Sequence, residues 1–280
     1  MLKFQVIIAF VMAVAFSACE PAAELQTPKA EAKGALFIIG GGELTPDLMA
    51  DMVRLAGVDS AGQVLILPMS SIEPDSSYLY MLEKIGGLCV NKPQMLMVDS
   101  TTTHDPSIAG RLASASLIYL SGGDQNRFMQ RIKGSVVADE IRKAYFNGAM
   151  IAGTSAGAAL MSKIMITGDQ KKVPEYESTY SLLRTDNAIY SEGLGLLDSV
   201  IVDQHFIVRS RYNRLFTALH DHPGLKGMGV DESTAAYVKG GEIKVYGESQ
   251  VILVESAGAV AQRDGKIIFD QMIVKSLVEE

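Results

Sequence analysis

The sequence has 280 residues, of which 48% are hydrophobic and 20% are charged, which suits one large domain with a sizeable core. Its 32 acidic and 25 basic residues give a formal net charge of −7. This acidic balance argues against nucleic acid as a bulk partner.

The N-terminus, residues 1–18, has the pattern of a bacterial export signal. Lys3 supplies the positive charge, and residues 6–16 form an apolar segment too short for a comfortable membrane span. The quartet Phe-Ser-Ala-Cys ending at Cys19 resembles a lipobox, in which the cysteine is lipidated and becomes the mature N-terminus. Its phenylalanine departs from the usual leucine, and the alternative is an ordinary signal peptide cut near Ala18. We expect an exported protein, held in the bacterial envelope (periplasm or outer membrane) by lipid on Cys19 and touching the membrane only through that lipid.

Residues 19–33 are polar and rich in Ala and Pro, which predicts a flexible tether between the lipid and a single domain at 34–280. Cys19 and Cys89 are the two cysteines, so lipidation of Cys19 leaves Cys89 without a disulfide partner. We expect Cys89 to be a small buried hydrophobic residue.

From residue 34 onward, short apolar segments alternate with helix-like segments. Such alternation predicts a mostly parallel sheet covered by helices on both faces, with ligands bound beyond the carboxyl ends of the strands. Glycine-rich turns at 40–42, 122–123 and 153–157 are expected at that edge. The expected strands are 35–39, 64–67, 94–98, 116–120 and 149–152, and the expected helices are 46–57, 76–86 and 126–147, the last broken near Gly134.

The C-terminal third has a different pattern. We expect a strand at 199–203, a helix at 210–220, and a hairpin at 235–246 that turns at its paired glycines. Two further short strands are expected at 251–255 and 266–269.

The run Gly153-Thr-Ser155-Ala-Gly157 lies between an apolar strand and a helix-like segment. Gly-x-Ser-x-Gly in this context is typical of a nucleophile elbow, where a sharp turn exposes the serine oxygen and leaves no room for neighbouring side chains. The same short motif also arises by chance in a chain with 26 glycines. If Ser155 is a nucleophile, it needs a base and an orienting acid elsewhere in the chain.

Four histidines are candidates for the base. His104 lies in a turn, and His220 and His222 lie at a helix C-terminus, where positive charge complements the helix dipole. The His-x-His pair has no further His or Cys at a zinc-like spacing, so we expect no metal site. His205 follows the strand at 199–203, which places it at the carboxyl edge of the sheet together with Ser155.

For the acid, the best stretch is Asp231-Glu232, which follows a short apolar run. Asp203 and Glu192 are alternative candidates for the acid, and composition does not distinguish among these four carboxylates.

Three arginines follow His205 closely: Arg209, Arg211 and Arg214. Arg209 is expected to start the helix, and the other two share a face at i,i+3 spacing. In an acidic protein this is a local positive site whose guanidinium groups suit carboxylates. The alternative is a solvated helix face paired with Asp or Glu.

Together, four motifs closely resemble the cyanophycinases of the peptidase S51 group, and the likeness covers most of residues 34–270. They are Ser121-Gly-Gly-Asp-Gln125, Gly153-Thr-Ser-Ala-Gly157, Asp203-Gln-His-Phe206 with its three arginines, and Gly229-Val-Asp-Glu232. The resemblance implies an α/β class I glutamine-amidotransferase-like fold with flavodoxin-like layering and a nucleophile elbow at Ser155.

The resemblance also implies site residues. Ser155 is the expected nucleophile, His205 the base and Glu232 the acid. The backbone N–H of Ala156 and one from Gly122 or Gly123 would form the oxyanion hole. The substrate-pocket positions are Gln125, Asp203, Gln204, Arg209, Arg211 and Arg214.

The family substrate is cyanophycin, a poly-aspartate with arginine on each β-carboxyl, cleaved to β-Asp-Arg dipeptides. No cofactor is implied, and a homodimer is possible because family members often form dimers. In the related aspartyl dipeptidase branch the acid precedes the histidine, which adds Glu175, Glu177 and Asp186 to Glu192 as candidates. Other S51 specificities for aspartyl or isoaspartyl peptides, and a non-catalytic binding lipoprotein, are the alternatives.

Two further expectations concern location and shape. Family members often act on granules in the cytoplasm, whereas the export signal indicates a scavenger outside the inner membrane. The polar segment 168–179 is either a lid that shapes specificity or a surface loop.

Overall fold

The computed structural model describes residues 32–99, 102, 105–172, 177–178 and 183–279. The proposed export signal, Cys19, all but the end of the tether, His104 and Glu175 lie outside the described residues. Among those described, no helix is both long and apolar enough to cross a membrane.

The larger sheet has seven strands in the order β11-β10-β1-β5-β4-β2-β3. Five neighbouring strands, in the order β1, β5, β4, β2 and β3, run parallel to one another. The hairpin β10–β11 extends the sheet beyond β1, and its strand β10 pairs with β1 in the antiparallel direction. The expected parallel sheet is therefore confirmed, although β3 is only two residues long. The bounds are β1 (Ala35–Ile39), β2 (Gln63–Leu67), β3 (Gln94–Met95), β4 (Ala115–Leu120), β5 (Met150–Thr154), β10 (Thr234–Lys239) and β11 (Glu242–Gly247).

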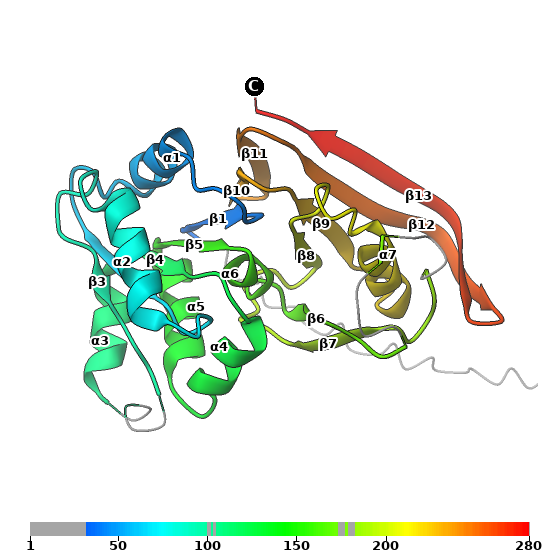
Figure 1. Ribbon diagram of the computed structural model, residues 1–280, viewed down its shortest axis with the longest axis horizontal. Coiled ribbons are helices and arrows are strands. Elements are labelled where there is room, and N and C mark those ends of the chain that lie inside the picture. The colour runs from blue at the N-terminus through cyan, green and yellow to red at the C-terminus, as the bar shows by residue number, and fades with distance from the viewer. Residues whose placement is uncertain (1–31, 100–101, 103–104, 173–176, 179–182, 280) are drawn as a thin grey trace, which may run out of the picture. The chain divides into compact units, whose positions relative to one another are not determined.

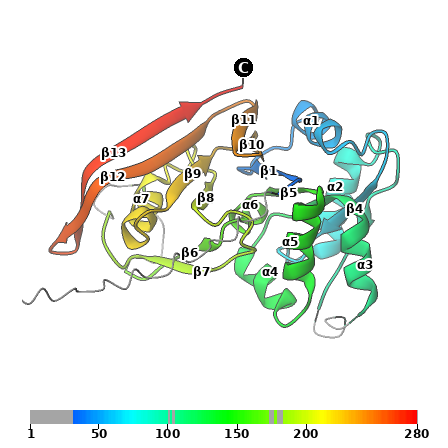
Figure 2. The same cartoon turned by 180° about the vertical axis from the view of Figure 1, so that it is seen from behind.

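Helices cover both faces of this sheet, as Figure 1 and the rear view in Figure 2 show. The local sequence explains the sharp limits of the first helix: Thr45 caps its N-terminus, Pro46 occupies its first turn, and Gly57 ends it at φ 69°. One face carries α1 (Pro46–Ala56) and α2 (Pro74–Ile85); the other carries α3 (Ser107–Ser114), α4 (Gln125–Ile132), α5 (Val137–Asn147) and α6 (Ala156–Ala159).

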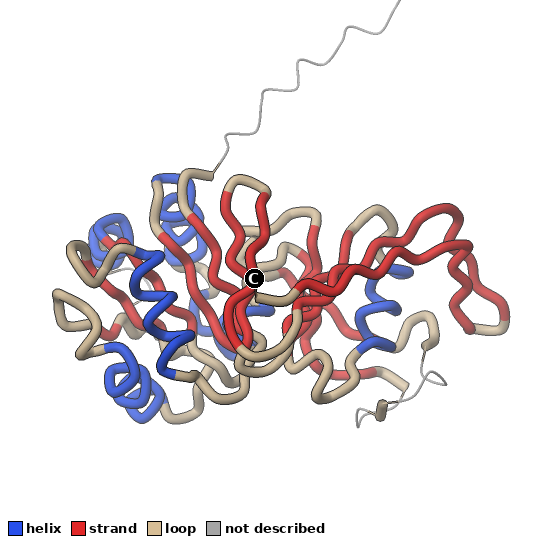
Figure 3. Tube along the Cα trace, turned by 90° about the horizontal axis from the view of Figure 1, so that it is seen from above, coloured by secondary structure: helices blue, strands red, loops and turns tan. Residues whose placement is uncertain are grey.

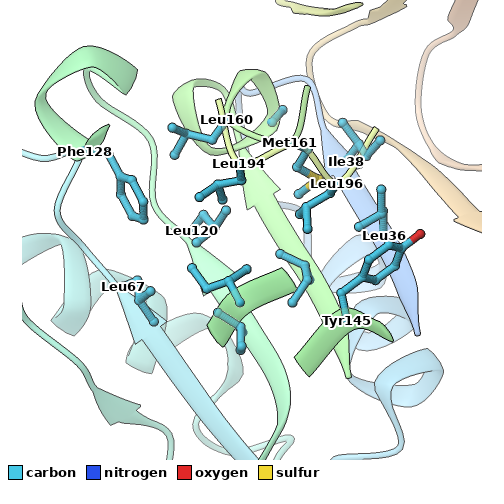
Figure 4. Packing of buried hydrophobic residues seen from close by; sticks show 14 of the residues in the cluster. Leu36, Ile38, Leu67, Leu120, Phe128, Tyr145, Leu160, Met161, Leu194 and Leu196 are labelled. Carbon is cyan, nitrogen blue, oxygen red and sulfur yellow. The ribbon is translucent and has the colours of Figure 1, made fainter. Parts of the chain in front are cut away.

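The core follows from the alternation of side chains along each strand. In β1, Leu36 and Ile38 join the cluster on the α5 side, whereas Phe37 joins the cluster under α1 and α2. Figure 4 shows the first cluster, with Tyr145 and Phe128 packed beside the strand residues. Each fully buried side chain of this size stabilises the fold by about 1.5–3 kcal/mol, which fixes the strands whose ends carry the site.

A second, four-stranded sheet has the order β13-β12-β9-β8 and carries α7 (Tyr212–Asp221). Its strands are β8 (Val200–Gln204), β9 (Lys226–Val230), β12 (Val251–Arg263) and β13 (Lys266–Leu277). The last two form a hairpin much longer than the short strands expected at 251–255 and 266–269 (Figure 3). Its tip is held by a hydrogen bond from the Thr185 N–H to the Gly265 carbonyl at 3.0 Å.

A third element is the two-stranded antiparallel sheet of β6 (Ile164–Gln170) and β7 (Ala188–Glu192), which the sequence did not reveal. The first part of the polar segment at 168–179 therefore belongs to a strand. Within that segment, residues 173–176 and 179 are outside the described part of the chain.

Candidate active site

Ser155 lies in a tight turn between β5 and α6. Its backbone has φ 52° and ψ −109°, a conformation that costs a non-glycine residue roughly 1–3 kcal/mol. Neither flanking glycine has room for a side chain: a Cβ on Gly153 would lie 2.6 Å from the Gly157 carbonyl oxygen, and one on Gly157 would lie 2.2 Å from that of Leu120. The Ser155 N–H donates to the Ile39 carbonyl at 3.0 Å, which ties the turn to β1. This is the elbow geometry expected from the motif.

His205 is brought to Ser155 by the other sheet. It follows β8 at φ 49°, and its N–H donates to the Gly40 carbonyl at 2.7 Å. Its Nε2 lies 2.8 Å from the Ser155 Oγ. The expectation that both residues share the edge of one sheet is wrong, because β5 and β8 belong to different sheets whose ends meet at this point.

The glycine loop after β1 packs against the imidazole. A Cβ on Gly41 would lie 2.2 Å from His205 Cε1, and a Cβ on Gly42 would lie 2.6 Å from Glu232 Cβ. Both glycines have positive φ. The sequence indicated that this loop opens toward the site, but its contact with the imidazole depends on the second sheet.

Glu232 lies between β9 and β10, and its Oε1 is 2.5 Å from His205 Nδ1. Its neighbour Asp231 is buried and turned away from the histidine. The Asp231 carboxylate accepts hydrogen bonds from the N–H groups of Ile207 and Val208 at 2.9 and 3.0 Å and from the Ser249 hydroxyl at 2.7 Å. Asp231 therefore fixes the turn that follows His205.

The remaining candidate acids have other partners or positions. Asp203 is paired with Arg214, and Asp186 is paired with Lys171. Glu192 is exposed at the end of β7. The backbone carbonyl of Glu177 accepts from the Asn213 side chain at 3.0 Å.

Burial lowers the pKa of His205 below its ordinary value. The hydrogen bond to Glu232 opposes this effect, and the positive charges of Arg209 and Arg211 add to it. The imidazole is therefore held in the neutral form that can accept a proton near neutral pH.

Two backbone segments present N–H groups beside the serine. Gly122 follows β4, and a Cβ placed on it would lie 3.7 Å from Ser155 Cβ. Gly123 has φ 133° and no room for a side chain, because its Cβ would lie 2.3 Å from the Ser70 carbonyl oxygen. Within the described residues, the N–H groups of Gly122, Gly123 and Ala156 have no hydrogen-bond acceptor. They are available to an oxyanion.

A pocket of about 270 Å3 opens beside Ser155 and His205 and includes the three arginines. Arg209 is 51% exposed, with its Nε 3.9 Å from Glu232 Oε1. Arg211 donates to the Gln204 carbonyl at 2.8 Å and also to that residue's side-chain oxygen. Because α7 begins at Tyr212, Arg209 and Arg211 precede the helix, so the expected shared helix face is wrong.

Arg214 and Asp203 form a buried ion pair at the base of this pocket. Arg214 is 6% exposed and Asp203 is 1% exposed, and Arg214 Nε donates to Asp203 Oδ2 at 2.7 Å. Arg214 and Gln204 line the pocket, whereas Asp203 does not. Asp203 therefore lies behind the pocket and positions Arg214.

Gln125 lines the same pocket but uses its amide to hold β6. Its Nε2 donates to the carbonyls of Ile166 and Thr167, both at 2.8 Å. Strand β6 forms a wall of the pocket through Thr167, Gly168 and Asp169, the last two of which begin the polar segment expected to be either a lid or a surface loop. In the described part of the chain, no cluster of His, Cys, Asp or Glu could hold a metal ion.

The model of peptidase family S51 matches residues 36–246. The chain belongs to this family. The relatives of this S51 peptidase include several proteins named cyanophycinase. The one from Trichormus variabilis is 32% identical over 83% of this chain and 76% of its own length. Those from Synechococcus elongatus and Geminocystis herdmanii are each 30% identical, over 80% and 84% of this chain and 68% and 85% of their own lengths.

Two solved structures share the fold of this S51 peptidase. A peptidase from an acI-B1 Actinobacterium has a TM-score of 0.64 at 21% identity, over 90% of this chain and 96% of that one. A putative peptidase E from Listeria monocytogenes has a TM-score of 0.52 at 17% identity, over 77% of this chain and 99% of that one. Membership of this family, together with its cyanophycinase relatives, makes this chain a serine-type peptidase with an α/β fold. This result argues against the alternative of a non-catalytic binding lipoprotein.

Proposed function

We propose that this S51 peptidase is an exported cyanophycinase, which releases β-Asp-Arg dipeptides from arginine-substituted poly-aspartate through a Ser155–His205–Glu232 triad. The observation that carries the proposal is the continuous chain of contacts from the Ser155 Oγ to His205 Nε2 at 2.8 Å and from His205 Nδ1 to Glu232 Oε1 at 2.5 Å.

In the first step, Ser155 Oγ attacks a backbone carbonyl carbon of the polymer while His205 Nε2 takes the hydroxyl proton. Glu232 accepts a hydrogen bond from the Nδ1–H of His205, which fixes the tautomer that leaves Nε2 free to act as the base. The carbonyl oxygen becomes an oxyanion bound by the N–H of Ala156 and that of Gly122 or Gly123.

The tetrahedral intermediate collapses when His205 returns the proton to the leaving nitrogen and the C–N bond breaks. The acyl group stays on Ser155. Water then attacks the ester and gives its proton to His205, and the serine leaves with that proton. The second step regenerates the enzyme without any cofactor.

The substrate assignment rests on the arginine side of the pocket. Arg209 is half exposed beside the triad, and Arg211 and Arg214 line the pocket next to it. Guanidinium groups in this arrangement suit the carboxylate that each Asp-Arg unit presents, which is the α-carboxylate of its arginine. The shared family with three cyanophycinases supports the same substrate class.

The decisive experiment is incubation of the protein with purified cyanophycin, followed by identification of the soluble product by mass spectrometry. We expect β-Asp-Arg from the wild type and none from Ser155→Ala. Retained turnover in Ser155→Ala would disprove the triad.

A second candidate is an S51 peptidase for other aspartyl or isoaspartyl peptides, since the same triad and arginines fit a peptide with one carboxylate. Asp-X and β-Asp-X dipeptides, compared with cyanophycin at equal enzyme concentration, separate the two. A higher kcat/KM on the dipeptides would favour the second candidate.

We also propose that the protein is exported and held in the envelope by lipid on Cys19. The support is the positive, apolar and lipobox-like order of residues 1–19. Metabolic labelling with an alkyne fatty acid should mark the wild type and Cys89→Ser, and Cys19→Ser should be unlabelled. Equal labelling of Cys19→Ser would rule out the anchor.

A further inference from the structure

Strand β6 contains an irregularity at the point where it meets the pocket. Ile166 pairs with Tyr190 and Gln170 pairs with Ala188, so three residues of β6 lie opposite one residue of β7. Gly168, in the middle of the three, has φ 99°. Bulges of this kind redirect side chains and are common beside active sites.

The bulge is held in place from both sides. Gln125 Nε2 donates to the carbonyls of Ile166, just before the bulge, and of Thr167, its first residue, and the Thr167 hydroxyl donates to the Ile189 carbonyl at 3.1 Å. The Asp169 N–H donates in turn to the Thr167 hydroxyl oxygen at 3.3 Å. Asp169 is thereby fixed in the wall of the pocket that contains Ser155, His205 and the arginines.

Asp169 differs from the other acid of this wall, Asp124. The Asp124 carboxylate caps α4, because it accepts from the N–H groups of Asn126 and Arg127 at 2.7 and 3.3 Å. Among the described residues, no cation or donor binds the Asp169 carboxylate. The two lysines that follow it bind elsewhere, Lys171 to Asp186 and Lys172 to the Thr185 carbonyl.

The pocket therefore has two charged sides. The arginines come from the segment that follows β8, and Asp169 comes from the bulge in β6. A substrate unit that presents both a carboxylate and a cation can satisfy both sides at once. A neutral or anionic side chain would leave Asp169 without a partner or bring two like charges together.

We propose that Asp169 determines specificity by binding the cationic side chain of the substrate unit held in the pocket. This inference rests on the proposed function, because it assumes that the arginines bind the carboxylate of the same unit. Asp169 touches the substrate but takes no part in proton transfer.

The test compares a synthetic (β-Asp-Arg)3 peptide with its citrulline counterpart, which has the same shape without the charge. In the wild type we expect kcat/KM to favour the arginine peptide by about tenfold, the scale of one charge-assisted hydrogen bond at an exposed residue such as Asp169. Asp169→Asn should reduce this preference to near unity, chiefly through KM, and Asp169→Lys should reverse it.

Two matched variants serve as controls. Glu242→Gln removes an exposed carboxylate from β11, outside this pocket, and should keep the wild-type preference. Asp124→Asn retains a capping side chain and should also keep it. The assignment would be overturned if Asp169→Asn kept the wild-type preference for the arginine peptide, or if only Asp124→Asn lost that preference.

Binding to the Ser155→Ala protein separates this inference from the proposed function. Calorimetry with β-Asp-Arg and β-Asp-citrulline measures the preference without turnover, first in Ser155→Ala and then in the double variant that also has Asp169→Asn. If the wild type cleaves neither peptide, the proposed function fails, and the calorimetric comparison still decides the role of Asp169. Equal affinity for the two dipeptides would refute that role.

Discussion

Gly41 lies against the imidazole of His205, so closely that a Cβ on the glycine would be 2.2 Å from Cε1. The residue also has φ 106°, which alanine adopts only with strain. Any side chain at this position must therefore move the ring that contacts Ser155.

We predict that Gly41→Ala lowers kcat by about 100-fold or more, because a displacement of about 1 Å at a reacting group has effects of that size. Gly57→Ala is the matched control, since Gly57 also has positive φ but has no atom within 4 Å of its Cβ position. It should cost stability of about 1 kcal/mol and leave kcat unchanged. Wild-type kcat in Gly41→Ala would show that the ring does not depend on this contact.

Glu232→Gln should lower kcat by roughly 10³- to 10⁴-fold, because the amide no longer fixes the productive tautomer of His205. Steady-state kinetics on cyanophycin measure this loss, and a fluorophosphonate probe reports the reactivity of Ser155. Glu192→Gln, at the exposed end of β7, should behave as the wild type. A large loss of kcat in Glu192→Gln together with wild-type kcat in Glu232→Gln would assign the acid to Glu192.

The lowered pKa of His205 predicts the acid limb of the pH profile. The base must be neutral, so kcat/KM is high above this pKa and falls as the pH drops through it. We expect the midpoint of this acid limb to lie below 6.5, the ordinary pKa of a histidine. Arg209→Gln removes a cation that lowers the pKa and should move the limb upward, and Arg209→Lys should leave it in place. A limb above 6.5 in the wild type would contradict the effect of burial.

Asp203→Asn should destabilise the fold by about 3–5 kcal/mol, because it leaves the buried Arg214 guanidinium without its counter-charge. Urea unfolding followed by circular dichroism measures the change. Asp51→Asn on α1 removes a more exposed pair with Arg54 and should cost less than about 1 kcal/mol. Equal losses in the two variants would show that burial does not matter for the Asp203 pair.

The sequence predicted the parallel sheet because apolar strands and helices alternate at regular spacing through residue 152. It did not predict the length of β12 and β13, whose outer halves contain small and polar residues such as Ser256 and Gly258. The Asp264-Gly265 pair at their turn is a strong hairpin signal, and it could have revealed the extension.

Within the site, the position of Ser155 could be predicted from local pattern, since its neighbours in sequence form the elbow. The separate roles of Asp231 and Glu232 could not be predicted in this way. They depend on which carboxylate faces the turn after His205 and which faces the imidazole ring. The function of Asp203 was also hidden, because its partner Arg214 lies eleven residues away on α7.

The site joins two sheets, since Ser155 follows β5 and His205 follows β8. A partially unfolded molecule that kept the larger sheet but released the smaller one would retain its serine and lose its base. Hydrolysis is therefore a sensitive measure of folding cooperativity in this protein. Activity that disappears before the larger sheet melts would reveal an intermediate that secondary-structure signals alone would miss.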